Sequence, residues 1–213
     1  AGISAGDAVI VGDSNFREFK AKVIEVSKDS YVVKVKSKVE ICRVPPRKIT
    51  LFVSLPKKKK MENIIFKCTQ LGVEEFIPVI SSRTIKKITS RQREKTYERW
   101  RKKARKGAEI SMRKNLPVIR ETVNFKEALE IYSREKFGSG IIFWEQNENQ
   151  KYIQEKDIAL KMAVFIGPEG GFSSKEVEAA IKAGLKMRTL GALILDVETA
   201  VIAGVSRLLC GES

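Results

Sequence analysis

The sequence contains no histidine and only three cysteines, Cys42, Cys68 and Cys210. The missing histidine excludes a histidine base, a serine–histidine triad and a histidine-ligated zinc site within this chain. The cysteines lie far apart without a C-x-x-C pair, which favours reduced structural thiols, a cytoplasmic protein and no metal site. No apolar run approaches membrane-spanning length, and no signal peptide is visible. We therefore expect neither a membrane nor a metal among the partners.

Acidic residues are the minority among charged ones, since 41 Lys+Arg against 26 Asp+Glu give a net charge of +15. Residues 83–106 alone hold twelve lysines and arginines against two glutamates. One concentrated basic block is typical of nucleic-acid binding. Most of this block falls in a helix predicted over residues 90–112, where Tyr97, Trp100 and Ala104 recur at helical spacing. We expect an apolar stripe inward, including Trp100 as a core residue, and a basic face outward.

The first 47 residues predict a small β domain. Apolar or alternating stretches at 8–11, 19–26 and 31–36 are separated by turn residues. Roughly 47 residues are too few for an independent β core without disulfides. Because the sequence begins at Ala1 rather than Met, we expect further residues upstream to complete this domain. We interpret residues 44–47, Val-Pro-Pro-Arg, as a linker and divide the chain into domains 1–47 and 48–213.

The second domain alternates strand and helix patterns. The predicted strands cover residues 49–55, 75–80, 118–120, 140–144, 162–166 and 185–190, and the predicted helices cover 58–71, 90–112, 125–132, a segment after Ser173, and 198–209. Residues 145–157 are interpreted as a polar connection. Such alternation predicts an α/β fold with a mainly parallel sheet and helices on both faces.

A glycine-rich turn, IGPEGGFS at residues 166–173, joins one of these strands to the helix that follows it. Ser173 and Glu176 fit a capping box at the helix start. Glycines permit positive φ and close backbone approach, and turns at the carboxyl ends of parallel strands bind ligands in many α/β folds. The P-loop and Rossmann spacings are both absent. A plain tight turn without a ligand is the alternative interpretation.

A second motif, LGALILDVETA at residues 190–200, follows about twenty residues later. Together with IGPEGGFS-x-x-E it resembles the RsmE-type family, within the SPOUT class of S-adenosylmethionine-dependent RNA methyltransferases. QLGV at 70–73 and AEISMR at 108–113, with Pro117 after it, are similar to further family segments. The matches span roughly residues 48–210.

The resemblance implies a SPOUT-type fold with a deep trefoil knot, a small N-terminal PUA-like or OB-like β-barrel that binds RNA, and a homodimer whose interface includes the 198–209 helix. It also implies S-adenosylmethionine as cofactor, and ribosomal RNA or the small ribosomal subunit as partner. Family members methylate ring nitrogen 3 of a uridine near the 3′ end of small-subunit ribosomal RNA.

The resemblance implies that the cofactor lies among three loops. The residues expected to hold it are Phe143, Trp144, Glu145, Ile166, Gly167, Pro168, Glu169, Gly170, Gly171, Leu190, Gly191, Leu195, Thr199 and Ala200. For RNA phosphates, the basic helix face and the lysine run before the first predicted helix supply Lys57, Lys58, Lys59, Lys60, Arg99, Arg101, Lys102 and Arg105.

Uridine nitrogen 3 must lose a proton, so the site needs a base or a cation that stabilises the resulting anion. Without histidine, the predicted catalytic residues are Glu198, Asp196 and Arg113, with Glu169 as a further candidate base. The chain departs from the family at three places, since Leu193 and Asp196 stand where the family has arginines, and Ile110 where it has glutamine. Asp196 would repel RNA phosphates, so we expect weak catalysis and a faster enzyme with arginine at this position.

Two alternative functions stay open. The chain is a related SPOUT methyltransferase with another ribosomal or transfer RNA target, or it is a catalytically weak RNA-binding protein of the same fold. Cofactor binding separates the enzymes from the inert fold, and the position of the methyl group separates the enzymes from each other.

Overall fold

The structure, a computed structural model, describes residues 2–13, 17–39, 45–57, 60–85, 88–145 and 151–210. The chain divides into two compact units, residues 1–44 with 112–115 and residues 45–111 with 116–213. The main division lies close to the predicted linker. Across the described segments, no helix combines the length and apolar character needed to cross a membrane.

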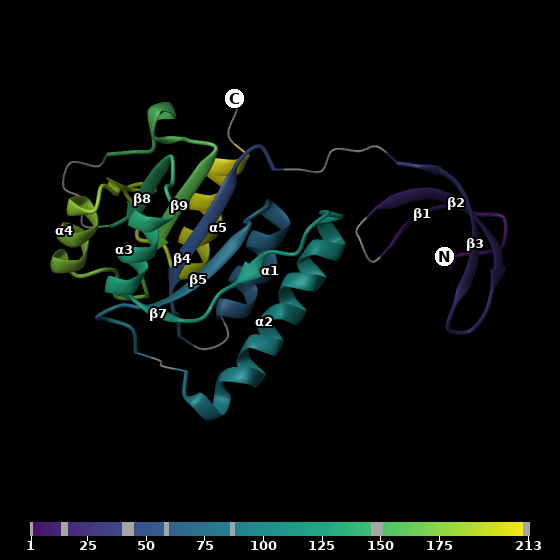
Figure 1. The fold of residues 1–213 in the computed structure, drawn as a ribbon, viewed down its shortest axis with the longest axis horizontal. Coiled ribbons are helices and arrows are strands. Elements are labelled where there is room, and N and C mark those ends of the chain that lie inside the picture. The colour runs from purple at the N-terminus through teal and green to yellow at the C-terminus, as the bar shows by residue number, and fades with distance from the viewer. Residues whose placement is uncertain are drawn as a thin grey trace. The chain divides into compact units, whose positions relative to one another are not determined.

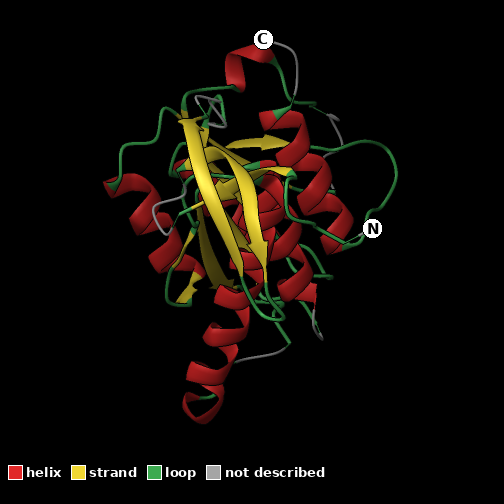
Figure 2. Ribbon diagram, turned by 90° about the vertical axis from the view of Figure 1, so that its right-hand side faces the viewer, coloured by secondary structure: helices red, strands yellow, loops and turns green. Residues whose placement is uncertain are grey.

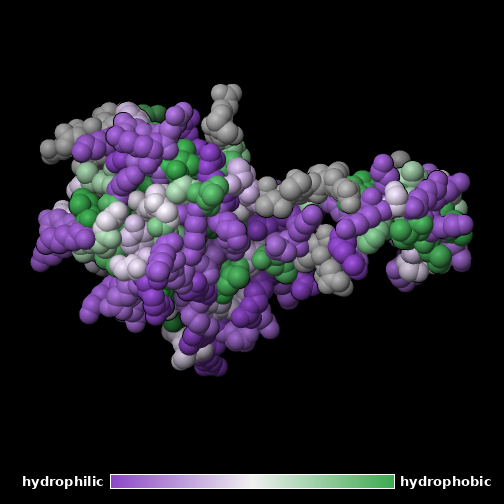
Figure 3. Space-filling view, turned by 45° about the horizontal axis from the view of Figure 1, so that its top comes forward, coloured by the Kyte–Doolittle hydropathy of each residue, from purple (hydrophilic) through white to green (hydrophobic). Residues whose placement is uncertain are grey.

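The N-terminal unit contains the antiparallel strands β1 (Ala8–Gly12), β2 (Glu18–Val26) and β3 (Tyr31–Lys38), in the order β1-β2-β3. All three predicted strands are confirmed, and such a sheet fits the barrel-like domain that we expected. Ala21 and Val23 are its buried apolar residues. Figure 3 shows green, hydrophobic surface on this unit. Its exposed large apolar side chains include Ile10, Ile24, Val26, Tyr31, Val32 and Val35.

The C-terminal unit is built on a parallel sheet with the strand order β10-β8-β9-β4-β5-β6, and β7 also pairs with β5. The strands are β4 (Lys48–Ser54), β5 (Glu75–Ile80), β6 (Val118–Ile119), β7 (Val123–Asn124), β8 (Ser139–Phe143), β9 (Lys161–Ile166) and β10 (Lys186–Arg188). The sheet confirms the predicted α/β class. The short β7 was missed, and β10 is shorter than the predicted strand at 185–190.

Helices cover both faces of this sheet (Figures 1 and 2). α1 (Lys60–Leu71), α2 (Ser90–Ser111) and α5 (Val197–Leu209) lie on one face, and α3 (Phe125–Arg134) and α4 (Ser174–Lys182) on the other. Successive side chains of the central strand β4 point to opposite faces of the sheet, so β4 contributes to the core on both sides. Leu51 and Val53 pack with α1 and α5, whereas Phe52 stacks on Phe165 in the core under α3 and α4.

The predicted helix-end signals are confirmed. Ser173 and Glu176 form the capping box of α4, with the Ser173 hydroxyl accepting from the Glu176 N–H. Gly72, directly after α1, has φ +110°, a conformation that a side chain would disfavour. The first residues of the predicted helix, Lys58 and Lys59, lie outside the described residues.

After β10 the chain returns past the connection between β8 and β9. Thr189 forms a parallel bridge with Tyr152, and its N–H donates to the Lys151 carbonyl at 2.9 Å. The following loop leads to α5, which packs against α1 on the face opposite α4. The chain thus contacts the β8–β9 connection directly after β10, before it continues to α5.

A buried ion pair fixes β10 at the sheet edge. Asp157 is fully buried at the end of a short 3-10 turn, η1 (Glu155–Asp157). Arg188 donates to both its carboxylate oxygens, at 2.5 and 2.6 Å, and Lys186 lies 3.2 Å away. These hydrogen bonds hold the pKa of Asp157 well below its usual value despite its burial, and those from Arg188 contribute most. The segment interpreted as a polar connection thus anchors an edge strand.

We expect Asp157→Asn to lower the free energy of unfolding by about 3–5 kcal/mol, because removing one partner leaves the other charges uncompensated. The stabilisation is complete at neutral pH and is lost as the pH falls below about 4, since the folded pKa is depressed. Urea unfolding measures both effects. Glu155→Gln, an exposed change in the same turn, should stay within about 0.5 kcal/mol, and an equal loss in both variants would contradict the anchoring role.

Candidate functional site

The register of the sheet brings four strand ends into one row. Arg188 of β10 is paired with Phe143 of β8, Phe143 with Ile166 of β9, and Ile166 with Val53 of β4. Because these strands are parallel, their carboxyl ends meet at the same edge, where α/β proteins bind ligands. The loops that begin at residues 144, 167 and 189 therefore start side by side.

The glycine-rich loop follows β9 and turns tightly. The Gly171 N–H donates to the Pro168 carbonyl at 2.8 Å, and Gly171 has φ +64°. A Cβ on Gly171 would lie 2.2 Å from Oε1 of Glu145, and a Cβ on Gly167 would lie 3.0 Å from the Gly171 carbonyl carbon. Gly171 favours glycine because of its positive φ, and Gly167 favours it because a Cβ there would be in tight contact with the backbone of the same loop.

Two residues after β5 form hydrogen bonds with this loop and with the start of α4. Arg83 Nη1 donates to the Gly170 carbonyl at 2.6 Å, and the Ser82 hydroxyl donates to Glu176 at 2.7 Å. Burial acts to raise the pKa of Glu176, but hydrogen bonds from Ser173 and Ser82 outweigh it, so the carboxylate is held ionised. Sequence reasoning missed Arg83 and Ser82 because their partners lie about ninety residues away along the chain.

The third loop runs from Thr189 to Asp196 and ends at the start of α5. The Thr189 hydroxyl donates to the Gly191 carbonyl at 3.0 Å. Leu193 and Ile194 are 81% and 88% exposed, although both are large and apolar. Exposed apolar side chains at the rim of a pocket are typical of surface that a ligand covers.

The three loops enclose a pocket of about 340 Å³, within the size range of small-molecule sites. It brings together every residue predicted to hold the cofactor except Gly170 and Thr199. Gly170 lies beside Arg83 instead, since its added Cβ would be 3.4 Å from Arg83 Cδ. The sequence analysis did not assign five further lining residues to cofactor binding: Thr189, Leu193, Ile194, Asp196 and Val197.

Asp196 is the N-cap of α5. Its side chain accepts from the Thr199 N–H at 2.8 Å and pairs with Lys60 Nζ at 3.2 Å. Hydrogen bonds from Thr199 and then Lys60 lower the pKa of Asp196 to about 2. Lys60 also lies 3.8 Å from Glu169, whose carboxylate accepts from the Lys57 N–H at 3.0 Å. The start of α1 is thus tied to two carboxylates that line the pocket.

The other predicted catalytic residues lie elsewhere. Glu198 faces α1, where it pairs with Lys67 at 3.4 Å and accepts a hydrogen bond from Asn63 at 3.5 Å. Arg113 is buried and belongs to the N-terminal unit. Neither residue lines the pocket, and their catalytic roles stay predictions.

The predicted RNA-binding residues of α2 lie on its exposed side, whereas Tyr97, Trp100 and Ala104 are buried as expected. Arg99 pairs with Glu62 and Arg101 with Glu94. Arg105 and Lys102 are exposed. Lys58 and Lys59 lie outside the described residues.

The protein has a parallel α/β sheet, and its glycine-rich loop and the loop before α5 line one pocket. These features define a protein of the SPOUT methyltransferase class, as predicted. A family model for the RNA methyltransferase domain matches residues 43–209. The chain belongs to this family of RNA methyltransferases, in its RsmE-type branch.

Relatives and solved structures agree with this assignment. Ribosomal RNA small subunit methyltransferase E of Bacillus subtilis is 29% identical, over 97% of this chain and 82% of its own. The protein of the same name from Mesomycoplasma hyopneumoniae is 34% identical, over 74% of this chain and 67% of its own. A Legionella pneumophila methyltransferase solved with S-adenosylmethionine is 26% identical, with a TM-score of 0.80, covering 98% of this chain and 84% of that chain.

We expect Asp196→Ala to lower the free energy of unfolding by about 1 kcal/mol, because α5 loses its N-cap. Asp196→Ser should keep most of this stability, since serine also caps helices. Thermal or urea unfolding of the two variants distinguishes capping from a purely electrostatic role. If both variants lose the same stability, the pair with Lys60 matters rather than the cap.

Proposed function

We propose that this protein transfers a methyl group from S-adenosylmethionine to ring nitrogen 3 of a uridine in small-subunit ribosomal RNA. The observation that carries the proposal is the single pocket formed by three loops at aligned strand ends, lined by twelve of the fourteen residues expected to hold the cofactor. Family membership and the names of the relatives support the same reaction.

The pocket suits this cofactor chemically. Apolar side chains such as Ile166, Leu190 and Leu195 offer a surface for the adenine. Glycines at 167, 171 and 191 leave backbone groups accessible, and the carboxylates of Glu145 and Glu169 offer acceptors for hydroxyl or ammonium groups. The bound cofactor supplies an electrophilic methyl group, and the protein's task is to position the acceptor.

We assign the stabilisation of the deprotonated uridine to Lys60. Its ammonium contacts two carboxylates that line the pocket, Asp196 and Glu169. In the structure these carboxylates neutralise Lys60, which does not line the pocket, so this role requires the ammonium to turn toward the bound uridine, where it would favour the anion formed when nitrogen 3 loses its proton. Asp196 itself is a poor proton acceptor, because its pKa is lowered to about 2. Lys60 thus supplies a positive charge beside the position where the family has arginine.

The remaining parts of the proposal concern partners. The basic face of α2 (Arg99, Arg101, Lys102 and Arg105) and Lys57 to Lys60 contact RNA phosphates, and the β1–β3 unit contributes to RNA binding. The protein is a homodimer through α5, and sedimentation at micromolar concentration tests this. A role on ribosomal RNA places the protein in the cytoplasm.

We expect replacement of both Leu193 and Ile194 by serine to weaken S-adenosylmethionine binding roughly 10- to 100-fold. Burying such side chains against a ligand contributes about 1.5–3 kcal/mol each when complete, and about 1.4 kcal/mol is a factor of ten. Folding stability should hardly change, because both side chains are exposed. Isothermal titration calorimetry measures the affinity, with Ala192→Ser, exposed and outside the pocket lining, as the matched control. Unchanged affinity in the double variant would remove this loop from the site.

The reaction is tested by incubating the protein with labelled S-adenosylmethionine and ribosomal RNA from cells that lack it. The proposal requires label at nitrogen 3 of a uridine in the small-subunit RNA. Label in large-subunit or transfer RNA would instead support the related SPOUT methyltransferase. Cofactor binding without any transfer to RNA or assembled subunits would support the catalytically weak RNA-binding protein.

A further inference from the structure

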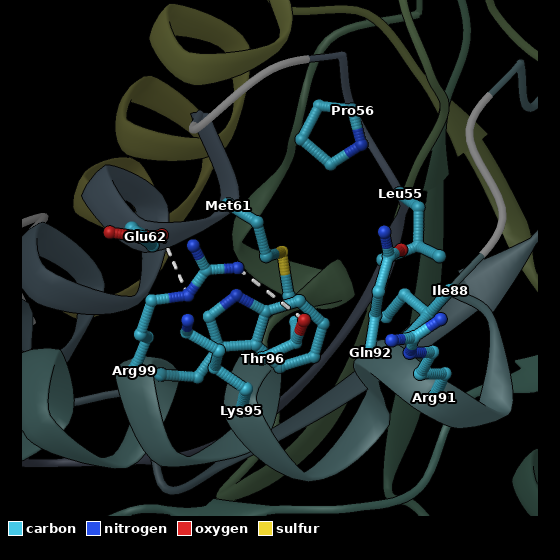
Figure 4. A pocket seen from close by; sticks show the side chains of 11 residues that line it. Leu55, Pro56, Met61, Glu62, Ile88, Arg91, Gln92, Lys95, Thr96 and Arg99 are labelled. Carbon is cyan, nitrogen blue, oxygen red and sulfur yellow. Dashed lines mark hydrogen bonds and ion pairs between the residues drawn. The ribbon is translucent and has the colours of Figure 1, made fainter.

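A second and larger cavity, of about 820 Å³, lies between the end of β4, the start of α1 and the N-terminal half of α2 (Figure 4). It shares no lining residue with the pocket at the glycine loop. In Figure 4, side chains extend from α2 toward residues that follow β4 and toward residues of α1. The labelled side chains are Leu55, Pro56, Met61, Glu62, Ile88, Arg91, Gln92, Lys95, Thr96 and Arg99. The proposed cofactor site leaves this cavity without a role.

The rim of the cavity carries unbalanced positive charge. Arg91, Lys95 and Arg99 follow each other at intervals of four residues, so they form one row along α2, about 6 Å apart. Like charges at this spacing destabilise a helix. Among the described lining residues, Glu62 is the single carboxylate, and it lies 3.7 Å from Arg99. Within the described ranges, Arg91 and Lys95 form no ion pair, so an anionic ligand would relieve their repulsion.

The lining residues without a charge are apolar except for two. Leu55, Met61 and Trp100 contribute apolar surface, and Tyr97 supports Trp100 with ring centroids 4.9 Å apart. Gln92 adds an amide and Thr96 a hydroxyl. Proteins read unstacked RNA bases with apolar or aromatic contacts and a few hydrogen bonds to base edges. Cations beside an apolar cavity therefore match a nucleotide, which joins a phosphate to a planar base.

The cavity also adjoins the proposed catalytic pocket. Its wall on this side is formed by Leu55 and Pro56, at the start of the segment 55–62, and by Met61 and Glu62, at the end of that segment. Within the same segment, the Lys57 N–H bonds Glu169, and Lys60 contacts Asp196 and Glu169. An RNA strand with one nucleotide at the glycine loop would therefore have a neighbouring nucleotide close to this cavity.

We propose that this cavity binds a nucleotide of the substrate RNA next to the one that is methylated. Arg91 and Lys95 hold its phosphate, and its base lies against Met61 and Leu55 with Gln92 and Thr96 in reach of the base edge. The choice of RNA as ligand rests on the proposed function, whereas the site rests on the cavity and its charge. Holding a flanking nucleotide fixes the strand while the target base enters the catalytic pocket.

The test uses Trp100, one of only two tryptophans in the sequence, as a reporter inside the cavity. In a Trp144→Phe background, a short single-stranded oligoribonucleotide should change the fluorescence of Trp100 in a saturable manner. Adding Arg91→Gln and Lys95→Gln should weaken this binding at least tenfold. It should also flatten the dependence of log affinity on log salt by about 0.7, since the two side chains hold one phosphate and each neutralised phosphate of a single strand contributes roughly 0.7.

The matched control removes one arginine and one lysine from the opposite face of the sheet. Arg134→Gln with Lys182→Gln lowers the net charge equally at the ends of α3 and α4, and it should leave the Trp100 titration almost unchanged. Equal weakening in both double variants would mean that only the overall charge matters and would overturn the proposal. The same holds if the oligonucleotide causes no change, or if inorganic phosphate produces the same signal at the same concentration.

Two further outcomes separate this proposal from the proposed function. Methyl transfer to ribosomal RNA without a Trp100 response would overturn the nucleotide site alone. A Trp100 response lost in the cavity variant, without methyl transfer to any RNA, would overturn the proposed reaction while supporting the site. If sedimentation shows that Arg91→Gln with Lys95→Gln alters self-association and RNA causes no response, the cavity is an interface between copies of the chain.

Discussion

The parallel pairing of β10, β8, β9 and β4 is the constraint on which the site depends. Their paired ends, Arg188, Phe143, Ile166 and Val53, form one row, so three loops distant in sequence begin next to each other. The edge strand β10 is short, and the buried charges of Asp157 and Arg188 compensate for its few backbone hydrogen bonds. Without this anchor the third loop would lose its fixed starting point.

Features with a local signal were predictable from the sequence. The strand, glycine turn and capping box around Gly171 and Ser173 lie within a dozen residues, and the apolar stripe of α2 repeats at helical spacing. The loops of the pocket were located by resemblance, and most of their residues do meet. Gly170 was placed in the pocket as part of the glycine-rich loop that the resemblance assigns to the cofactor, but its position beside Arg83 depends on a segment after β5 that no local pattern identifies.

Asp196 shows how a family comparison can conceal a physical signal. Its difference from the family arginine suggested a defect in catalysis, yet an aspartate directly before a helix is a common N-cap. The structure gives it that position, with Lys60 as its partner. The contacts of Lys60 with Asp196 and Glu169 join residues more than a hundred positions apart, so they were not readable from the sequence.

The central claim is that this chain methylates nitrogen 3 of one uridine in small-subunit ribosomal RNA. Mass spectrometry of this RNA, purified from cells with and without the protein, tests the claim most directly. The account predicts a 3-methyluridine near the 3′ end in cells that contain the protein, and its loss in cells without it. An unchanged modification pattern in the small-subunit RNA would contradict the account.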